Sequence, residues 1–215
     1  MDEAHPHDGG PVTSLEIERK YDIDSAASVP DWTALPGVVR VDDPEERDLD
    51  ARYLDTADGA LATSLMALRR RRGGPDAGWH LKRSTPEGKH ETHWPLVDPD
   101  ADDEPVPAAV ADALSAVARG PFAPIARIRN ARIAYTLRDA DGGLVAEFVD
   151  DRVVATDLRR GVETSWREWE LELGPAAPAD AAAREALFAA ADRIVQGAGG
   201  AIAASGSKLA RALGG

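Results

Sequence analysis

The chain has 215 residues, which is enough for one domain with a substantial hydrophobic core. Its formal net charge of −13 argues against a general nucleic-acid-binding protein, because such proteins are basic overall. The absence of cysteine excludes disulfides, thiolate metal sites and cysteine nucleophiles. No apolar run approaches the roughly 20 residues of a membrane helix, and residues 1–10 lack the apolar stretch of a signal peptide. We therefore expect a cytoplasmic protein with no membrane partner.

The first half of the chain is typical of short strands joined by loops. Residues 1–13 are predicted to be a disordered tail, and residues 14–213 a single domain. Helical turns are expected over 31–35 and 58–66, and loops over 42–46 and 98–107, where acidic residues and proline gather. The Gly-Gly-Pro segment 73–77 predicts a hairpin loop between two strands. The predicted strands of this half are residues 14–22, 48–55, 67–72, 78–83 and 89–97.

The second half begins with helical spacing over 107–118, which Gly120 and Pro121 end. Turn residues at 141–143 and 160–161 then separate three longer strands. An Ala-rich helix over 178–196 and a terminal helical turn over 207–213 complete the chain. The three strands are residues 125–138, 144–156 and 164–173. About eight hairpin-linked strands with few helices predict an α+β fold: an antiparallel β-barrel with helices packed outside.

Charge alternates along these strands in an unusual way. In the segment Glu-Ile-Glu-Arg-Lys, Glu16, Glu18 and Lys20 share one face of an extended strand. The pattern returns in later strands, with apolar residues on the opposite face. If the apolar face packs against helices, the charged face lines a wet interior, because unpaired charges are costly in a dry one.

Two sets of charged residues would meet in that interior. Carboxylates supply the all-oxygen coordination that Mg²⁺ or Mn²⁺ prefers, and lysine and arginine bind phosphate oxygens. The carboxylates are Glu16, Glu18, Asp151, Glu168, Glu170 and Glu172. The cations are Lys20, Arg69, Arg71, Lys82, Arg127, Arg129 and Lys208. Taken singly, each strand could instead be a solvent-facing surface, and His80 could simply hydrogen-bond at the surface of the sheet. The joint occurrence favours a metal-bound polyphosphate.

Seven motifs in a fixed order then resemble the CYTH, or triphosphate tunnel metalloenzyme, superfamily. The first is Glu16-x-Glu18-x-Lys20, the signature ExExK. The others are Tyr53-Leu54-Asp55-Thr56, Leu68-Arg69-x-Arg71, Trp79-His80-Leu81-Lys82, Glu147-Phe148-Val149-Asp150-Asp151, Trp166-Arg167-Glu168-x-Glu170-x-Glu172 and Ser207-Lys208-Leu209-Ala210-Arg211. The resemblance covers nearly the whole chain after residue 13. It implies an eight-stranded antiparallel tunnel that acts on a triphosphate with a divalent metal.

Specific roles follow from this resemblance. The six carboxylates would hold the metal, and the seven cations would hold the phosphates. Lys20, Asp151 and Glu168 would also take part in catalysis, with Lys20 orienting a phosphate oxygen. The expected partner is a small-molecule triphosphate, with no nucleic acid, and the expected assembly is a monomer or homodimer. The predicted reaction is hydrolysis of inorganic triphosphate to pyrophosphate and phosphate, because no aromatic cluster in the charged strands indicates a base pocket.

Three alternatives remain open at this stage. A class IV-type adenylate cyclase would release cyclic AMP and pyrophosphate, and a thiamine triphosphatase would act on a different triphosphate. A non-catalytic module would bind polyphosphate or a nucleotide without cleaving it. The residues by themselves do not choose among these substrates.

Overall fold

The computed structural model describes residues 10–98 and 105–215. It contains one antiparallel sheet of 11 strands with four α-helices and a short 3₁₀ helix. The predicted tail falls mostly on residues 1–9, and much of the predicted acidic loop on 99–104; both segments lie outside the described residues. The first strand begins at Val12, two residues before the expected domain boundary. Among the described residues, no helix combines the length and apolarity needed to cross a membrane.

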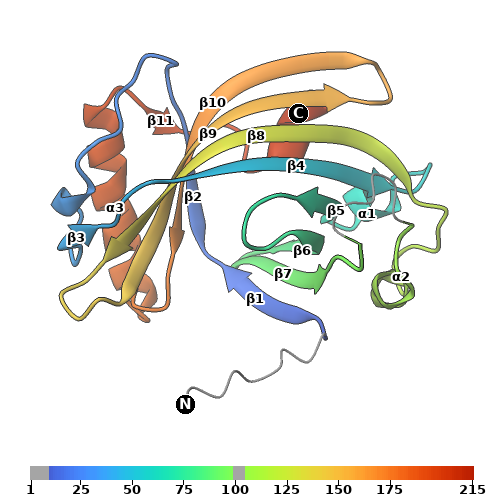
Figure 1. Cartoon of the computed structure of the whole chain (residues 1–215), viewed down its shortest axis with the longest axis horizontal. Coiled ribbons are helices and arrows are strands. Elements are labelled where there is room, and N and C mark those ends of the chain that lie inside the picture. Colours follow the sequence, from blue (N-terminus) through green and yellow to red (C-terminus); the bar gives the residue numbers. More distant parts are fainter. Residues whose placement is uncertain (1–9, 99–104) are drawn as a thin grey trace.

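The strands follow one another around a single curved sheet (Figure 1). Its hydrogen-bonded order is β1-β7-β6-β5-β4-β8-β9-β10-β2-β11, with β3 beside β8. The strands of the first half are β1 (Val12–Glu16), β2 (Glu18–Asp22), β3 (Arg40–Val41), β4 (Glu45–Asp55), β5 (Met66–Arg72), β6 (Gly78–Thr85) and β7 (Gly88–Pro95). The remaining strands are β8 (Ala123–Arg138), β9 (Leu144–Asp157), β10 (Val162–Leu173) and β11 (Ala201–Ile202).

The predicted closed barrel of eight strands is wrong. The predicted strand over 14–22 divides at Ile17: β1 pairs with β7 and β2 pairs with β10, at opposite ends of the sheet order. Three short strands, β1, β3 and β11, raise the number to 11. Since one residue separates β1 from β2, the two ends of the order lie on one continuous segment, and the sheet curls without closing its hydrogen-bond ladder. The number of strands depends on where the pairing partner changes, and an alternating sequence pattern does not show such a change within one extended segment.

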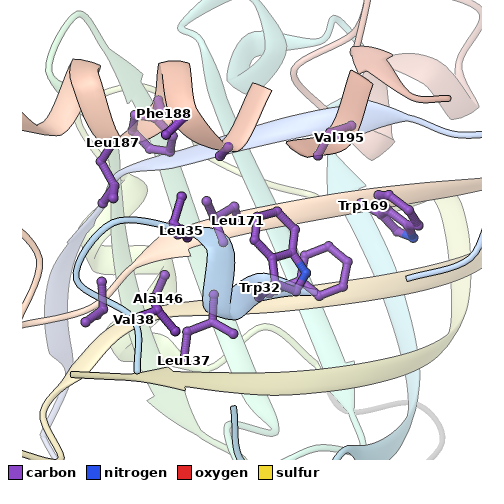
Figure 2. Packing of buried hydrophobic residues seen from close by; sticks show 14 of the residues in the cluster. Trp32, Leu35, Val38, Leu137, Ala146, Trp169, Leu171, Leu187, Phe188 and Val195 are labelled. Atoms are coloured by element: carbon purple, nitrogen blue, oxygen red, sulfur yellow. The ribbon is translucent and has the colours of Figure 1, made fainter. Parts of the chain in front are cut away.

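Helices cover the outer face of the sheet. The helical elements are η1 (Trp32–Ala34), α1 (Ala60–Thr63), α2 (Ala108–Leu114), α3 (Ala181–Gly197) and α4 (Lys208–Ala212). Asp180 caps α3 by accepting a hydrogen bond from the Ala183 backbone at 3.0 Å. Figure 2 shows Leu187, Phe188 and Val195 of α3 packed over Leu171 and Trp169 of β10. Trp32 inserts beside Phe148 with ring centroids 4.7 Å apart.

A second apolar layer lies outside β5–β7. Leu68, Trp79 and Trp94 point away from the charged face and pack against Leu61 of α1 and Leu114 of α2. The tight turn that follows β5 depends on Gly73, which has a φ of +77°. A Cβ on Gly73 would come 1.9 Å from the carbonyl oxygen of Asp48, so no other residue fits there. Because this outer layer is apolar, the charged residues that alternate with it, such as Arg69, Arg71 and Lys82, lie on the inner face.

Helix α4 is the exception, because it packs on the inner face. Leu209, Ala212 and Leu213 contact the apolar part of that face, which includes Ala51 and Ile128. Ser207 caps the helix, its hydroxyl accepting from the Ala210 backbone. This placement directs Lys208 toward the charged interior.

Candidate active site

One cavity of about 350 Å³ runs along the inner face of the curled sheet. Residues from β1, β2, β4–β10 and the start of α4 line it. Eight Lys or Arg and six Asp or Glu side chains are among them. The cations therefore outnumber the acids here, in a chain whose formal net charge is −13. Cationic side chains gathered on the wall of a cavity raise the local concentration of anions there.

Three carboxylates meet around the ammonium group of Lys208. Its Nζ lies 2.8 Å from Asp151 Oδ2, 2.6 Å from Glu168 Oε1 and 2.5 Å from Glu170 Oε1. The sheet register explains this convergence, since Glu168 stands opposite Asp151 in the β9–β10 ladder. Burial would lower the pKa of Lys208, but the three carboxylates outweigh it and raise that pKa. The three carboxylates therefore form a centre that binds a cation strongly.

Arg132 of β8 completes this centre. It forms a two-pronged ion pair with Asp151, at 2.8 and 2.7 Å, and reaches Glu170 at 3.1 Å. Lys20 also pairs with Glu170 and lies 3.0 Å from Glu18 Oε2. Burial alone would raise the pKa of Glu170, but Lys20, Lys208 and Arg132 hold it well below its ordinary value.

A second acidic group lies where β1 and β2 join. Glu16 pairs with Lys82 at 2.6 Å, and Glu18 pairs with Lys89 at 2.6 Å. Glu172 differs, because its neighbours across the two ladders are the carboxylates Glu18 and Glu147. Burial, followed by the charges of Glu16 and Glu18, raises the pKa of Glu172 to about 7. This crowding of carboxylates would be relieved by a cation.

The donor atoms of both acidic groups suit a hard divalent cation. Ligand oxygens of Asp151, Glu168 and Glu170 lie within 4.8 Å of one another, and all three residues are buried. Glu172, which lies beside Glu16 and Glu18, adds further carboxylate oxygens to the same cavity. Mg²⁺ and Mn²⁺ favour such all-oxygen sets, whereas Zn²⁺ and Cu²⁺ favour nitrogen and sulfur. The residues present therefore fit a divalent metal.

The opposite wall of the cavity is basic. Arg69 and Arg71 alternate along β5 and share its inner face, while Arg70 lies on the other face and donates to the Asp98 carbonyl. Arg71 pairs with Asp76, and Arg69 lies 3.5 Å from the Tyr53 hydroxyl. Burial and then the charge of Arg69 lower the pKa of Arg71. The part of this lowering that comes from Arg69 reflects repulsion between two neighbouring guanidinium groups, which a phosphate group would offset.

Most of the predicted site residues come together in this cavity. Asp151 and Glu168 lie immediately behind its wall, in contact with Lys208. The predicted residues that line the cavity are Glu16, Glu18, Lys20, Arg69, Arg71, Lys82, Glu170, Glu172 and Lys208.

The expectation that Arg127 and Arg129 hold phosphate is wrong. Both side chains point outward, with 41% and 51% of their surface exposed, and pair with Asp50 and Glu163. The inner face of β8 carries the even-numbered residues Ile128, Asn130 and Arg132. A strand has a period of two, so taking the wrong parity exchanges every side chain between the faces. Because β8 carries arginine on both faces, its composition did not indicate which face was which.

Eight further polar residues line the cavity although the sequence patterns did not single them out for the site. They are Arg47, Tyr53, Asp76, Lys89, Asn130, Arg132, Glu147 and Ser207. Tyr53, Glu147 and Ser207 lie within the recognised motifs, which was the available signal. Arg47 and Arg132 stand opposite each other in the β4–β8 ladder, so only the strand pairing brings them together.

Comparison with known proteins agrees with this geometry. The sequence profile of the CYTH domain matches residues 14–204, and the chain belongs to the CYTH family. This confirms the family resemblance; six of the seven motifs fall within the matched residues, and the motif at 207–211 lies beyond them. The chain is 39% identical over 216 aligned residues to the Mycobacterium tuberculosis proteins Rv2226 and MT2285, covering 95% of this chain and 41% of each relative. It thus spans less than half the length of these curated relatives.

Solved structures share the fold at low sequence identity. A candidate adenylate cyclase from Bacillus halodurans superimposes with a TM-score of 0.62 at 18% identity, over 93% of this chain and 97% of that one. The Hippeastrum protein HpAC1, a candidate adenylyl cyclase described as having a dominant triphosphatase activity, gives a TM-score of 0.53 at 18% identity. That match covers 91% of this chain and 94% of HpAC1. These likenesses establish the CYTH-like fold.

Proposed function

We propose that this chain is a metal-dependent triphosphatase that hydrolyses inorganic triphosphate to pyrophosphate and phosphate. The observation that carries the proposal is one cavity in which basic side chains face carboxylates, three of which lie close enough together to hold a metal ion. A polyphosphate and a divalent cation together would neutralise both sides. Family membership and the triphosphatase activity described for HpAC1 support this choice.

The carboxylates divide into two metal-binding groups. Asp151, Glu168 and Glu170 form the first, whose ligand oxygens already lie close together. Glu16, Glu18 and Glu172, which line the same cavity, form the second. A bound Mg²⁺ or Mn²⁺ would supply charge neutralisation at the phosphate oxygens and make an attacking water more acidic. Lysines that pair with these carboxylates, such as Lys20 and Lys208, would then be released toward the phosphates.

The basic residues would orient the phosphate chain. Arg69, Arg71 and Lys82 approach it from β5 and β6, and Arg132 from β8. Phosphoryl transfer requires mainly positioning and charge stabilisation from the protein. Glu168 is suited to accept the proton of the attacking water, because burial raises the pKa of its carboxyl group above the ordinary value and so makes it a stronger base. The Trp166 indole donates to one Glu168 oxygen and fixes its orientation.

Inorganic triphosphate is favoured over a nucleotide by the composition of the walls. Tyr53 is the one aromatic side chain among the described lining residues, and only 7% of it is exposed. A nucleobase generally needs a flat aromatic or guanidinium surface to stack on. The arginines that could offer one lie among the carboxylates and are held by ion pairs.

A substrate panel tests the proposal. Phosphate release would be measured from inorganic triphosphate, thiamine triphosphate and ATP, each with Mg²⁺, with Mn²⁺ and with excess chelator. We expect the highest kcat/KM with inorganic triphosphate and at least a 100-fold loss on chelation. Cyclic AMP with pyrophosphate as the ATP products would identify a cyclase instead. Tight binding without phosphate release would identify a binding module.

The two faces of β8 give a further prediction. Arg132→Met should raise the KM for inorganic triphosphate about 10-fold or more, because one charge-assisted phosphate contact is lost. Arg129→Met, on the same strand but on the outer face, should change KM less than 2-fold. Steady-state kinetics on the two variants make the comparison, and equal effects would contradict the assigned faces.

A further inference from the structure

His80 of β6 is fully buried and does not line the cavity. Its Nδ1 lies 2.9 Å from Glu91 Oε1, and its Nε2 lies 3.0 Å from the backbone oxygen of Asp76. Burial lowers the pKa of His80 to about 4, and the charge of Arg69 acts in the same direction. Glu91 Oε1 can only accept a hydrogen bond, so the contact at Nδ1 requires a proton on that nitrogen. A hydrogen bond to a carboxylate is also stronger than one to a carbonyl.

Glu91 connects His80 to the basic wall. While its Oε1 accepts from His80, its Oε2 lies 2.9 Å from Lys82 Nζ and 3.5 Å from Arg69 Nη2. One buried carboxylate is therefore shared between a histidine and two cations of the proposed phosphate site. If it lost the His80 hydrogen bond, Glu91 would be free to turn both oxygens toward Lys82 and Arg69. It would then compete with a phosphate for them.

A metal at this position is disfavoured by the surrounding charges. Ligand atoms of Asp76, His80 and Glu91 lie within 4.8 Å of one another. However, Arg71 already pairs with Asp76, and Lys82 and Arg69 already contact Glu91. Here only two carboxylates face three positive groups, whereas Asp151, Glu168 and Glu170 supply three carboxylates, so an additional cation is less well balanced at this position. The cluster is better described as an internal support for the basic wall.

We propose that His80 is a positioning residue for the anion site: by holding one oxygen of Glu91, it keeps Lys82 and Arg69 available to phosphate. The inference deepens the proposed triphosphatase function and rests on the same cavity. It assigns His80 no contact with the substrate. It predicts that the loss of the Nδ1 donor weakens anion binding through Lys82.

Two substitutions of His80 distinguish the roles of its two ring nitrogens. The amide nitrogen of Asn reaches about as far as Nδ1, and that of Gln about as far as Nε2. We expect His80→Asn to bind inorganic triphosphate within about 3-fold of the wild type. We expect His80→Gln to bind it about 10-fold more weakly. His90 lies exposed on the adjacent strand, and His90→Asn and His90→Gln provide matched controls that should leave affinity unchanged.

Calorimetry with inorganic triphosphate in excess chelator measures these affinities without any turnover. If the wild type binds inorganic triphosphate in chelator but does not hydrolyse it when Mg²⁺ or Mn²⁺ is supplied, only the triphosphatase assignment is contradicted. The affinities of the His80 variants would still test the positioning role. A double-mutant cycle completes the test: in a Lys82→Met background, His80→Gln should change affinity less than 2-fold. Additive effects, or equal weakening by His80→Asn and His80→Gln, would overturn the proposal. Should His80→Gln fail to fold by thermal unfolding, His80→Met, which also lacks the donor, takes its place.

Discussion

Glu170→Gln is expected to reduce metal-dependent phosphate release at least 100-fold. Glu170 lies at the centre of the site, where Lys20, Arg132 and Lys208 all contact its carboxylate. The amide keeps the shape of the side chain but removes the charge that would hold a divalent cation. Loss of one such preorganised electrostatic group costs about 10²–10³ in kcat. Phosphate release across a range of Mg²⁺ concentrations measures the effect.

The same variant should retain its affinity for the anion. Removal of Glu170 leaves three nearby cations with less negative charge to balance, so binding of inorganic triphosphate in chelator should be unchanged or tighter. Glu163→Gln, the same change at an exposed position of β10, is the control and should retain full activity. An active Glu170→Gln enzyme would remove this carboxylate from the metal site. Weakened anion binding would point instead to a general collapse of the cavity.

Asp150→Ala is expected to lower the free energy of unfolding by about 3–5 kcal/mol, the typical cost of breaking a buried ion pair. Asp150 and Arg167 form a two-pronged pair at 2.8 Å, with 3% and 7% of their side chains exposed. Arg167 also donates to the backbone oxygens of Asp24, Ser25 and Ala27, fastening the loop after β2 to the sheet. Without Asp150 the guanidinium is left buried and unpaired. Denaturant unfolding at pH 7 measures the loss.

An exposed pair provides the comparison. Glu163→Ala removes the partner of Arg129, and pairs as exposed as this one contribute about 0–1 kcal/mol. Because Asp150 and Arg167 lie outside the cavity lining, the folded fraction of Asp150→Ala should keep a near-normal KM. A loss of stability no larger than that of Glu163→Ala would show that the buried pair adds little to the net free energy of folding.

Neighbouring residues in these strands therefore have different roles. Asp150 and Arg167 support the outer side of the sheet, whereas Asp151 and Glu168, one position along, face the proposed metal site. Both pairs stand within motifs that identified the family. The motif shows that the residues matter, but the role of each depends on the face it occupies.

The sequence by itself determined the family and the inner faces of most strands. ExExK, the Arg69–Arg71 pair and the Glu168–Glu172 alternation are local patterns, and a period of two places their side chains without knowledge of the partner strands. Only the tertiary structure decided the orientation of β8, the break of the first strand at Ile17 and the burial of His80 beside Glu91. These features depend on register and pairing between segments far apart in the chain. When both faces of a strand carry charge, as in β8, the local sequence does not indicate which face turns inward or which strand pairs with it.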